Sequence, residues 1–188
     1  MKDDILSLRI EKIIPETTDT KSYILALVNN NRIDFLPGQF FTIIFRFEHE
    51  TVRRSYSIAS LPGEPLKITV KRVENGAVSR FVLINWKVGD IIESLAPAGR
   101  FHLPAQASFP RDLFFFAAGS GIAPVIPQIR YLLQAEKQSN VYLLYSCRSE
   151  ADTIFYAEIQ QLAKKYPQFR VRYFFSDPAA LGKTHPAQ

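Results

Sequence analysis

The sequence predicts a two-domain protein, in which an antiparallel six-stranded β-barrel is followed by a partial α/β domain built on a parallel sheet. Residues 1–104 carry six short segments of alternating apolar and polar residues with turn signals between them, a pattern typical of a closed antiparallel barrel. Residues 111–188 instead alternate strand, helix, strand, helix and strand, which predicts parallel strands joined by right-handed crossovers. The segment 104–112 carries Pro, Ala and polar residues and is expected to link the two domains.

The barrel strands are separated by turn residues, for example Asn29-Asn30-Asn31 and Pro37-Gly38. Between such signals, alternating apolar residues predict half-buried strands. One short helix is expected over residues 77–86, where apolar residues recur at helical spacing after the turn Asn75-Gly76. The six strands are expected at residues 5–14, 21–28, 39–47, 53–60, 66–74 and 91–96.

The second domain opens with residues 113–118, Leu-Phe-Phe-Phe-Ala-Ala, a continuous apolar run that predicts a strand buried on both faces. The turn 119–121 follows, and Pro124 is compatible with the first turn of the next helix. Helices are expected at residues 124–137 and 152–166, and further strands at 141–146 and 169–176.

Composition excludes several classes of protein. Cys147 is the only cysteine and the three histidines are scattered, so neither a disulfide framework nor a metal site is expected. The longest apolar run, 113–127, is interrupted by Gly and Pro, and the N-terminus lacks an apolar signal segment; we expect no membrane span and a cytoplasmic location. The net charge of +5 comes from interspersed residues, with no basic run longer than Arg53-Arg54, which disfavours nucleic-acid binding.

Residues 53–60, Arg-Arg-Ser-Tyr-Ser-Ile-Ala-Ser, form the first candidate site. Arg54 offers a planar set of donors suited to phosphate oxygens, Tyr56 an aromatic face, and Ser55 and Ser57 small hydroxyls. A ligand with a phosphate end and a flat aromatic end would use all of these groups. The alternative is a solvated strand whose Arg and Tyr face water.

Two further stretches are suited to phosphate. Gly76, Ala77, Val78 and Ser79 begin the only helix of the barrel, where free backbone N–H groups attract anions, and Lys71 precedes them. The alternative is an ordinary Asn-Gly turn.

The second stretch joins a predicted buried strand to a helix, the setting of a dinucleotide-binding turn. Pro124 replaces the third glycine of the usual fingerprint, so the common dehydrogenase pattern does not match, and a turn used only for packing is the alternative. Its residues are Gly119, Ser120, Gly121, Ile122, Ala123 and Pro124.

These motifs, in this order and spacing, resemble the ferredoxin–NADP⁺ reductase superfamily, and among its members the reductase components of bacterial oxygenases. The segments Pro37-Gly38-Gln39-Phe40, Pro97-Ala98-Gly99-Arg100-Phe101 and Tyr145-Ser146-Cys147-Arg148-Ser149 also look like that family. The resemblance covers nearly the whole chain. It implies an FAD-binding barrel over residues 1–104 and a partial NAD(P)-binding domain over 111–188.

The resemblance also implies roles for residues of the barrel. Arg54 would hold the flavin pyrophosphate, Tyr56 would pack on the isoalloxazine ring, and Ser57 would lie near flavin N5. Tyr56 and Ser57 are therefore the catalytic candidates. The backbone of Val70 and Lys71 would line the flavin, and residues 76–79 would cradle its pyrophosphate, which favours FAD over FMN.

In the second domain, residues 119–124 would receive the phosphates of the nicotinamide dinucleotide. Ser146 and Arg148 would lie near the adenosine ribose. Arg148 favours a 2′-phosphate and hence NADPH, with NADH as the alternative.

The family's nucleotide domain usually continues for further strands, one of which carries a Cys-Gly motif beside the nicotinamide. Cys147 lies too early to be that cysteine. Two functions follow from the resemblance: transfer of electrons from NAD(P)H through FAD to a ferredoxin, haem or oxygenase component, or a flavin-binding module without its own NAD(P)H turnover.

Overall fold

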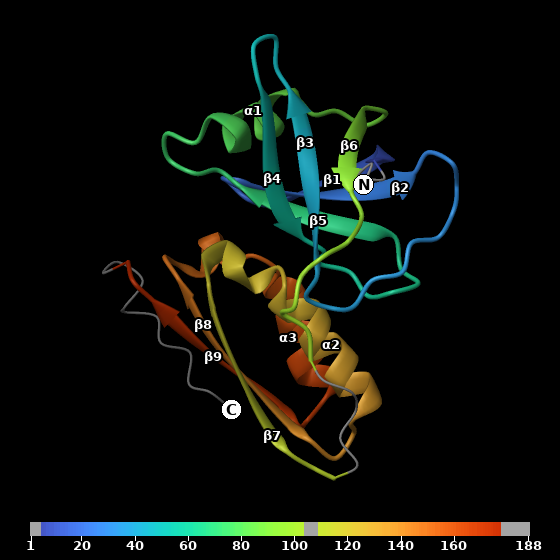
Figure 1. Cartoon of the computed structure of the whole chain (residues 1–188). Coiled ribbons are helices and arrows are strands. Elements are labelled where there is room, and N and C mark those ends of the chain that lie inside the picture. Colours follow the sequence, from blue (N-terminus) through green and yellow to red (C-terminus); the bar gives the residue numbers. More distant parts are fainter. Residues whose placement is uncertain (1–4, 104–108, 178–188) are drawn as a thin grey trace.

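The computed structural model describes residues 5–103 and 109–177 of the chain. Two units follow one another along the sequence, a β-barrel above and an α/β unit below in Figure 1. This arrangement confirms the predicted fold class, an antiparallel six-stranded barrel followed by a parallel sheet with helices. Among the described residues, no helix is long and apolar enough to cross a membrane.

The barrel strands form one antiparallel sheet in the order β4-β3-β6-β1-β2-β5. A bridge between Ile58 and Ile68 joins the chain just after β4 to β5, so the two edge strands of the sheet meet. The strands are β1 Ile5–Thr17, β2 Thr20–Leu27, β3 Phe40–Arg46, β4 Thr51–Ser57, β5 Leu66–Lys71 and β6 Ile91–Leu95. Helix α1, Ala77–Asn85, follows β5.

The barrel core is aromatic, as its composition predicts. Tyr23 is fully buried, its ring meets the Trp86 ring edge-on at 5.1 Å, and its hydroxyl donates a 3.3 Å hydrogen bond to the Val82 carbonyl of α1. Burial raises the pKa of Tyr23 to about 12, so the hydroxyl stays a donor. Each fully buried side chain of this kind stabilises the fold by roughly 1.5–3 kcal/mol. These contacts fix α1, and therefore its N-terminus, against the barrel.

The second unit has three parallel strands, β7 Asp112–Ala118, β8 Asn140–Cys147 and β9 Phe169–Phe175. Helices α2, Val125–Ala135, and α3, Tyr156–Lys165, lie on the same side of this sheet (Figure 1). The inward residues of the strands and the apolar residues of both helices form a second core, distinct from that of the barrel.

The prediction that β7 is buried on both faces is wrong. Phe115 is buried beneath the helices, but Phe114 is 58% and Phe116 73% exposed. Successive side chains of a strand point to opposite faces, and the described helices cover one face only. Phe114 and Tyr142 stack on the other face, with ring centroids 4.6 Å apart.

Several element boundaries also differ from the prediction. β5 ends at Lys71 rather than residue 74, because the chain turns through Asn75 with a φ of 59°. The helix expected over residues 152–166 is divided into a 3-10 turn, η2 Glu150–Asp152, and α3. Phe155 separates them with a φ of 62°, a left-handed conformation that no α-helix can contain.

The barrel and the second unit are packed against each other. Ala59, two residues beyond β4, is fully buried in the second core. The Gln128 side chain of α2 donates to the Phe101 carbonyl at 3.1 Å, and Arg130 of α2 forms an ion pair with Glu64 of the barrel. The segment that follows β4 is therefore held by its packing against the second unit. The domain limits at residues 104 and 111 stay a prediction.

Candidate functional site

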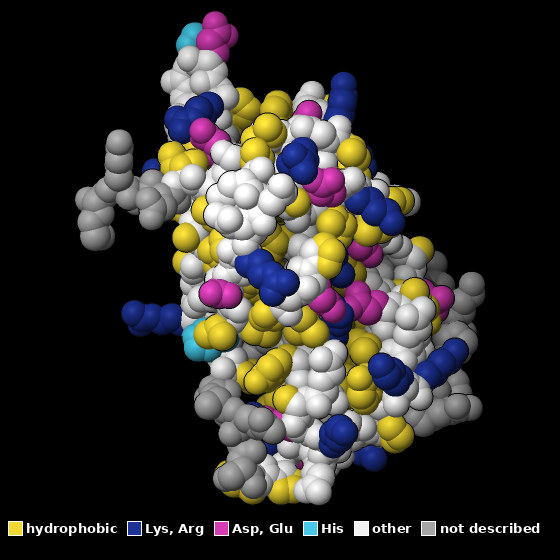
Figure 2. All heavy atoms as spheres, turned by 90° about the vertical axis from the view of Figure 1, so that its right-hand side faces the viewer, with side chains coloured by type: hydrophobic (Ala, Val, Ile, Leu, Met, Phe, Trp, Pro, Cys, Tyr) yellow, Lys and Arg dark blue, Asp and Glu magenta, His cyan; other side chains and the backbone are white. Residues whose placement is uncertain are grey.

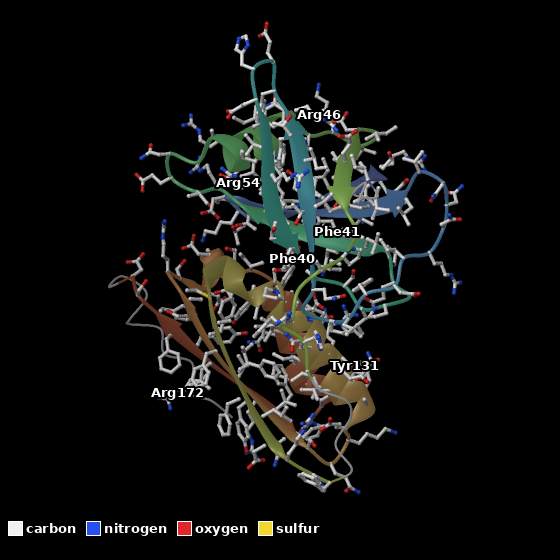
Figure 3. The ribbon with its side chains drawn as sticks, in the orientation of Figure 1. Phe40, Phe41, Arg46, Arg54, Tyr131 and Arg172 are labelled. Atoms are coloured by element: carbon white, nitrogen blue, oxygen red, sulfur yellow. The ribbon has the colours of Figure 1, made fainter. Side chains whose placement is uncertain are left out.

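Strand β4 carries the first candidate site at the edge of the barrel sheet. Its register pairs Arg54 with Ile43 and Tyr56 with Phe41, which places both on the face that the core side chains share. Ser57 pairs with Phe40 and lies on the opposite face, as strand alternation predicts. Phe40 and Phe41 lie at the end of β3 that faces the second unit (Figure 3), so Tyr56 and Ser57 lie there too.

The two larger side chains of β4 differ in exposure. Tyr56 is half-buried against the barrel core, and burial raises the pKa of its hydroxyl while the Arg54 guanidinium opposes that rise. Arg54 is exposed, and its Nη1 donates a 2.8 Å hydrogen bond to the Arg53 carbonyl (Figure 3). Ser55 is exposed on the other face and shares a 3.2 Å hydrogen bond with Thr42. A fixed cation and a partly covered ring therefore stand side by side on one face.

Strand β5, at the other edge of the sheet, ends in the sequence Val70-Lys71. Val70 is buried, and its side chain belongs to the barrel core. The Lys71 ammonium lies 3.7 Å from the Asp19 carboxylate, which also accepts 2.8 Å hydrogen bonds from the Thr17 and Thr20 hydroxyls. Burial alone would raise the pKa of Asp19, but these hydrogen bonds and the Lys71 charge lower it below its ordinary value. Asp19 is therefore an anion that holds Lys71 in place.

The turn before α1 is held together by two of the predicted phosphate-binding residues. The buried Ser79 hydroxyl accepts the Val73 N–H at 3.0 Å and is itself directed at the Gly76 carbonyl at 3.3 Å. A Cβ on Gly76 would come within 2.8 Å of the Ser79 oxygen, so glycine is required by the turn itself. Ala77 is exposed at the helix start, where no side chain caps the backbone. The anion-binding capacity of this site thus rests on backbone N–H groups from Ala77 and Val78 onward.

The turn after β7 has a different form from the predicted one. Gly119–Ile122 forms a 3-10 turn, η1, and α2 begins only at Val125 with Pro124 as its N-cap, so the glycines do not open the α-helix directly. Gly119 has a φ of 48°, and its carbonyl accepts a 2.9 Å hydrogen bond from the Tyr145 hydroxyl.

Within this turn, Ser120 and Gly121 are exposed, whereas Ile122 and Ala123 are buried in the second core. The exposed outer half therefore offers backbone groups to a ligand, and the buried half fixes their position.

Two of the stretches that the sequence predicts to bind phosphate lie close together in the structure. A Cβ built on Gly119 would lie 3.9 Å from the Lys71 ammonium nitrogen. Lys71 belongs to the barrel and Gly119 to the second unit, so a cation from one unit lies beside the turn of the other that the sequence predicts to bind phosphate.

The other predicted residues of the second unit lie at the end of β8. Ser146 is exposed, and Arg148 has a side chain that is 73% exposed, with its Nε 3.8 Å from an Asp152 oxygen. Cys147 is buried, and burial raises the pKa of its thiol. Among the described residues, no three His, Cys, Asp or Glu side chains gather in a way that could hold a metal ion.

A cleft of about 1390 Å³ between the two units was missed by the sequence analysis. Residues at or just beyond the carboxyl ends of β8 and β9, Ser149 and Phe175 among them, line it together with residues of the barrel. Its lining includes Lys67 from the barrel, Glu150 and Phe155 from the segment between β8 and α3, and Tyr156 and Glu158 from the first turn of α3. The available signal was the acidic and aromatic sequence that follows the second predicted parallel strand.

Charges are mixed on the outer surface of the molecule. On the face shown in Figure 2, Lys and Arg side chains are interspersed with Asp and Glu and form no continuous basic patch.

Comparison with known proteins identifies both units. Residues 7–103 match the family model of the oxidoreductase FAD-binding domain, and residues 115–185 match that of the oxidoreductase NAD-binding domain. The ferredoxin reductase component of 3-ketosteroid-9-alpha-monooxygenase from Rhodococcus rhodochrous is 37% identical over 165 residues, which cover 85% of this chain and 46% of that protein. The glycine betaine monooxygenase reductase from Pseudomonas aeruginosa is 32% identical over 165 residues, covering 86% of this chain and 44% of the relative. The chain spans about half the length of these curated relatives.

Solved structures agree with this assignment. The FAD/NAD binding domain of nitric oxide dioxygenase from Vibrio cholerae has a TM-score of 0.82 and 25% identity, covering 97% of this chain and 76% of that one. The ferredoxin–NADP⁺ reductase of Plasmodium falciparum with 2′P-AMP has a TM-score of 0.79 and 26% identity, covering 93% and 75%. The predicted resemblance is confirmed: the chain belongs to the ferredoxin–NADP⁺ reductase superfamily, with an FAD-binding domain followed by an NAD-binding domain.

Proposed function

We propose that the chain binds FAD and a nicotinamide dinucleotide and passes electrons from NAD(P)H through the flavin to an acceptor protein. The observation that carries this proposal is the position of Lys71 beside Gly119, because it puts the flavin-side and dinucleotide-side stretches at one junction. The relatives described as reductase components of oxygenase systems support the same direction of electron flow.

The residues present fit an FAD. Arg54 supplies an exposed cation, the half-buried Tyr56 supplies a ring on the same face, and α1 begins without a side-chain cap. In this proposal Arg54 and the first turn of α1 bind the pyrophosphate, and Tyr56 and Ser57 orient the ring system. The backbone of Val70 and Lys71 lines its edge. When bound, a flavin accepts a hydride and releases electrons singly, chemistry that belongs to the cofactor.

The protein's part is to orient the two ligands and to exclude water between them. Ser120 and Gly121 face outward from a turn fixed by Tyr145, and Lys71 adds positive charge at that turn. Positioning of this kind turns an encounter of two molecules into an intramolecular step and needs no side-chain nucleophile or general base.

The acceptor is proposed to be a ferredoxin, a haem protein or an oxygenase component, and the location to be cytoplasmic. A second candidate function is a flavin-binding module without turnover of its own. The observation behind it is that the chain spans about half the length of the curated relatives.

The two functions are separated by one experiment. The chain is purified, saturated with FAD, made anaerobic and mixed with NADH or with NADPH while the flavin absorbance is followed. Bleaching by either donor supports the reductase. A flavin that stays bound and oxidised identifies the module, and a chain that binds no FAD refutes both.

A further inference from the structure

Four charged side chains meet where the barrel packs against the second unit. The Arg130 guanidinium of α2 forms ion pairs with Glu64 of the barrel and, through its Nε at 3.5 Å, with Glu158 of α3. The other Glu158 oxygen lies 3.4 Å from the Lys67 ammonium of β5. Each unit contributes one anion and one cation, and the Glu64–Arg130 and Lys67–Glu158 pairs cross the boundary. These four residues are called the interface network below.

The interface network is largely shielded from solvent. The side chains of its two cations, Lys67 and Arg130, are only 15% and 18% exposed. Burial alone would raise the pKa of Glu64, but a 3.0 Å hydrogen bond from the Leu61 N–H and the Arg130 guanidinium lower it below its ordinary value. Partly buried ion pairs add little net stability, because desolvation offsets their attraction, but they require a defined geometry. The network is therefore suited to fixing the orientation of the two units.

The network is joined to the strand that carries the candidate flavin-binding residues. The Lys67 carbonyl accepts a 2.7 Å hydrogen bond from the Ala59 N–H, and the Lys67 N–H donates to the Ser60 hydroxyl at 3.1 Å. Ala59 and Ser60 are buried in the segment directly after β4. The Lys67 ammonium also lies 4.5 Å from the centre of the Phe155 ring, which belongs to the second core. Lys67 is thus bonded to the end of β4 by its backbone and to the second unit by its side chain.

Strand β5 contacts the second unit at two places. Ile68 and Val70 lie in the barrel core, so the residues on either side of them point outward. The outward Lys71 lies beside the Gly119 turn, and Lys67, four residues earlier, contacts α3. These contacts are about 13 Å apart along an extended strand. The Lys71 end is where the two proposed ligands would meet, and the Lys67 end sets the angle between the units.

A small change of that angle would matter for a reaction between two bound ligands. Rotating the second unit by about 5° about the network would move the Gly119 turn by roughly 1 Å relative to the barrel, and a misplacement of that size can slow a positioned reaction about a hundredfold. Small, polar interfaces between domains otherwise allow relative motion. Two ion pairs that cross the boundary side by side oppose such a rotation.

We propose that the interface network is a set of positioning residues, which hold the second unit at the angle that brings a bound nicotinamide dinucleotide to the flavin. In that step the reduced nicotinamide loses a hydride and is oxidised, and the flavin that gains the hydride is reduced. The network acts on this step through the relative placement of β5 and the Gly119 turn. The inference rests on the proposed function and adds to it the residues that align its two halves.

The first test measures orientation in the apoprotein and needs no turnover. Spin labels are attached at Lys12→Cys in β1 and Lys164→Cys in α3, both exposed positions, in a Cys147→Ala chain, so that only the introduced thiols react. The distance between the labels is measured in frozen solution. The intact network is expected to give one narrow distribution, and Arg130→Gln and Glu158→Gln to widen it about twofold. Arg130→Lys, with one ammonium for two carboxylates, should give an intermediate width.

Arg111→Gln is the matched control. It breaks an ion pair with Glu136 in which the Arg111 side chain is 23% exposed, but that pair lies within the second unit. A loss of stability common to any broken ion pair would appear in this variant as well. The width of the distance distribution therefore separates positioning from folding, and thermal unfolding shows that each variant is folded.

The second test follows the reaction. Anaerobic bleaching of the flavin at saturating NADH or NADPH is expected to be about 10- to 100-fold slower in Arg130→Gln and in Glu158→Gln. FAD and 5′-AMP, titrated separately, should bind these variants as tightly as they bind the wild type. Arg111→Gln should be bleached at the wild-type rate.

The inference is overturned if folded Arg130→Gln and Glu158→Gln keep the wild-type width, or if Arg111→Gln is as wide as they are. It is also overturned if the two variants are bleached at the wild-type rate, or if their affinity for either ligand falls as far as the rate does. A wild type that binds FAD and is bleached by neither donor refutes the reductase function alone, and the measured widths still show whether the network fixes the orientation.

Discussion

The hydroxyl of Tyr145, buried in β8, donates a 2.9 Å hydrogen bond to the carbonyl of Gly119 in the turn after β7. This bond ties the exposed glycine turn to the middle of the parallel sheet. Burial raises the pKa of the Tyr145 hydroxyl well above its ordinary value, so the group is protonated and able to donate at neutral pH.

Replacing Tyr145 with Phe is expected to loosen that turn while keeping the ring in the core. Losing one partner of a buried hydrogen bond costs about 1–3 kcal/mol, which should appear as a lower free energy of unfolding in urea. Affinity for 5′-AMP should fall several-fold, and affinity for FAD should not change. Tyr142→Phe, which removes a hydroxyl from the same strand on the open face of the sheet, is the control. Equal effects of the two substitutions would contradict a special role for Tyr145.

Arg54 is expected to contribute to FAD affinity rather than to folding. Its charge-assisted contact with a pyrophosphate is worth roughly 1.5–3 kcal/mol, so Arg54→Ala should weaken FAD binding by roughly 10- to 150-fold. Fluorescence titration of the apoprotein with FAD measures this. Arg46→Ala removes another exposed arginine of the barrel, paired with Glu93 on the neighbouring strand, and should leave FAD affinity intact. If Arg54→Ala binds FAD as tightly as the wild type does, Arg54 does not bind the pyrophosphate.

The architecture could be predicted from local sequence because most barrel strands alternate apolar and polar residues, and because the first two parallel strands are apolar runs at residues 113–118 and 141–146. Which face of the parallel sheet the helices cover could not be predicted. Residues 113–118 are apolar throughout, and only the placement of α2 and α3 on one side distinguishes the buried Phe115 from the exposed Phe116. Local composition does not encode which face the rest of the chain covers.

The candidate site, too, could be predicted only in part from the sequence. The motif residues of β4 and of the Gly119 turn could be identified from residue type and order. The hydrogen bond that the Ser79 hydroxyl accepts from the Val73 N–H could not be predicted, because it depends on how the chain folds back in the turn before α1. The cleft between the two units depends on side chains from β1, β5 and the region around α3, which are far apart in sequence and meet only when the two units pack.

Asp19 is expected to make stability depend on pH in the acidic range. Its pKa in the folded protein lies below the ordinary value of 3.8, so its contribution is fully present above that value. The contribution is lost as pH falls through the lower folded pKa. Asp19→Asn should therefore destabilise the protein by about 1–3 kcal/mol near neutral pH and by less in strong acid. Urea unfolding of both proteins across this range checks it, and a constant difference at all pH values would contradict it.

The open face of the parallel sheet is expected to determine solution behaviour more than stability. Phe116 is 73% exposed, so Phe116→Lys removes apolar surface without emptying a packed position. Surface substitutions of this kind usually change the free energy of unfolding by less than about 0.5 kcal/mol. Phe116→Lys should reduce the binding of a hydrophobic dye and the tendency to aggregate, since parallel sheets are normally covered on both faces. Phe115→Ala, one residue earlier and buried, should instead cost about 3–5 kcal/mol. A large loss of stability in Phe116→Lys, or dye binding equal to that of the wild type, would show that this face is covered in solution.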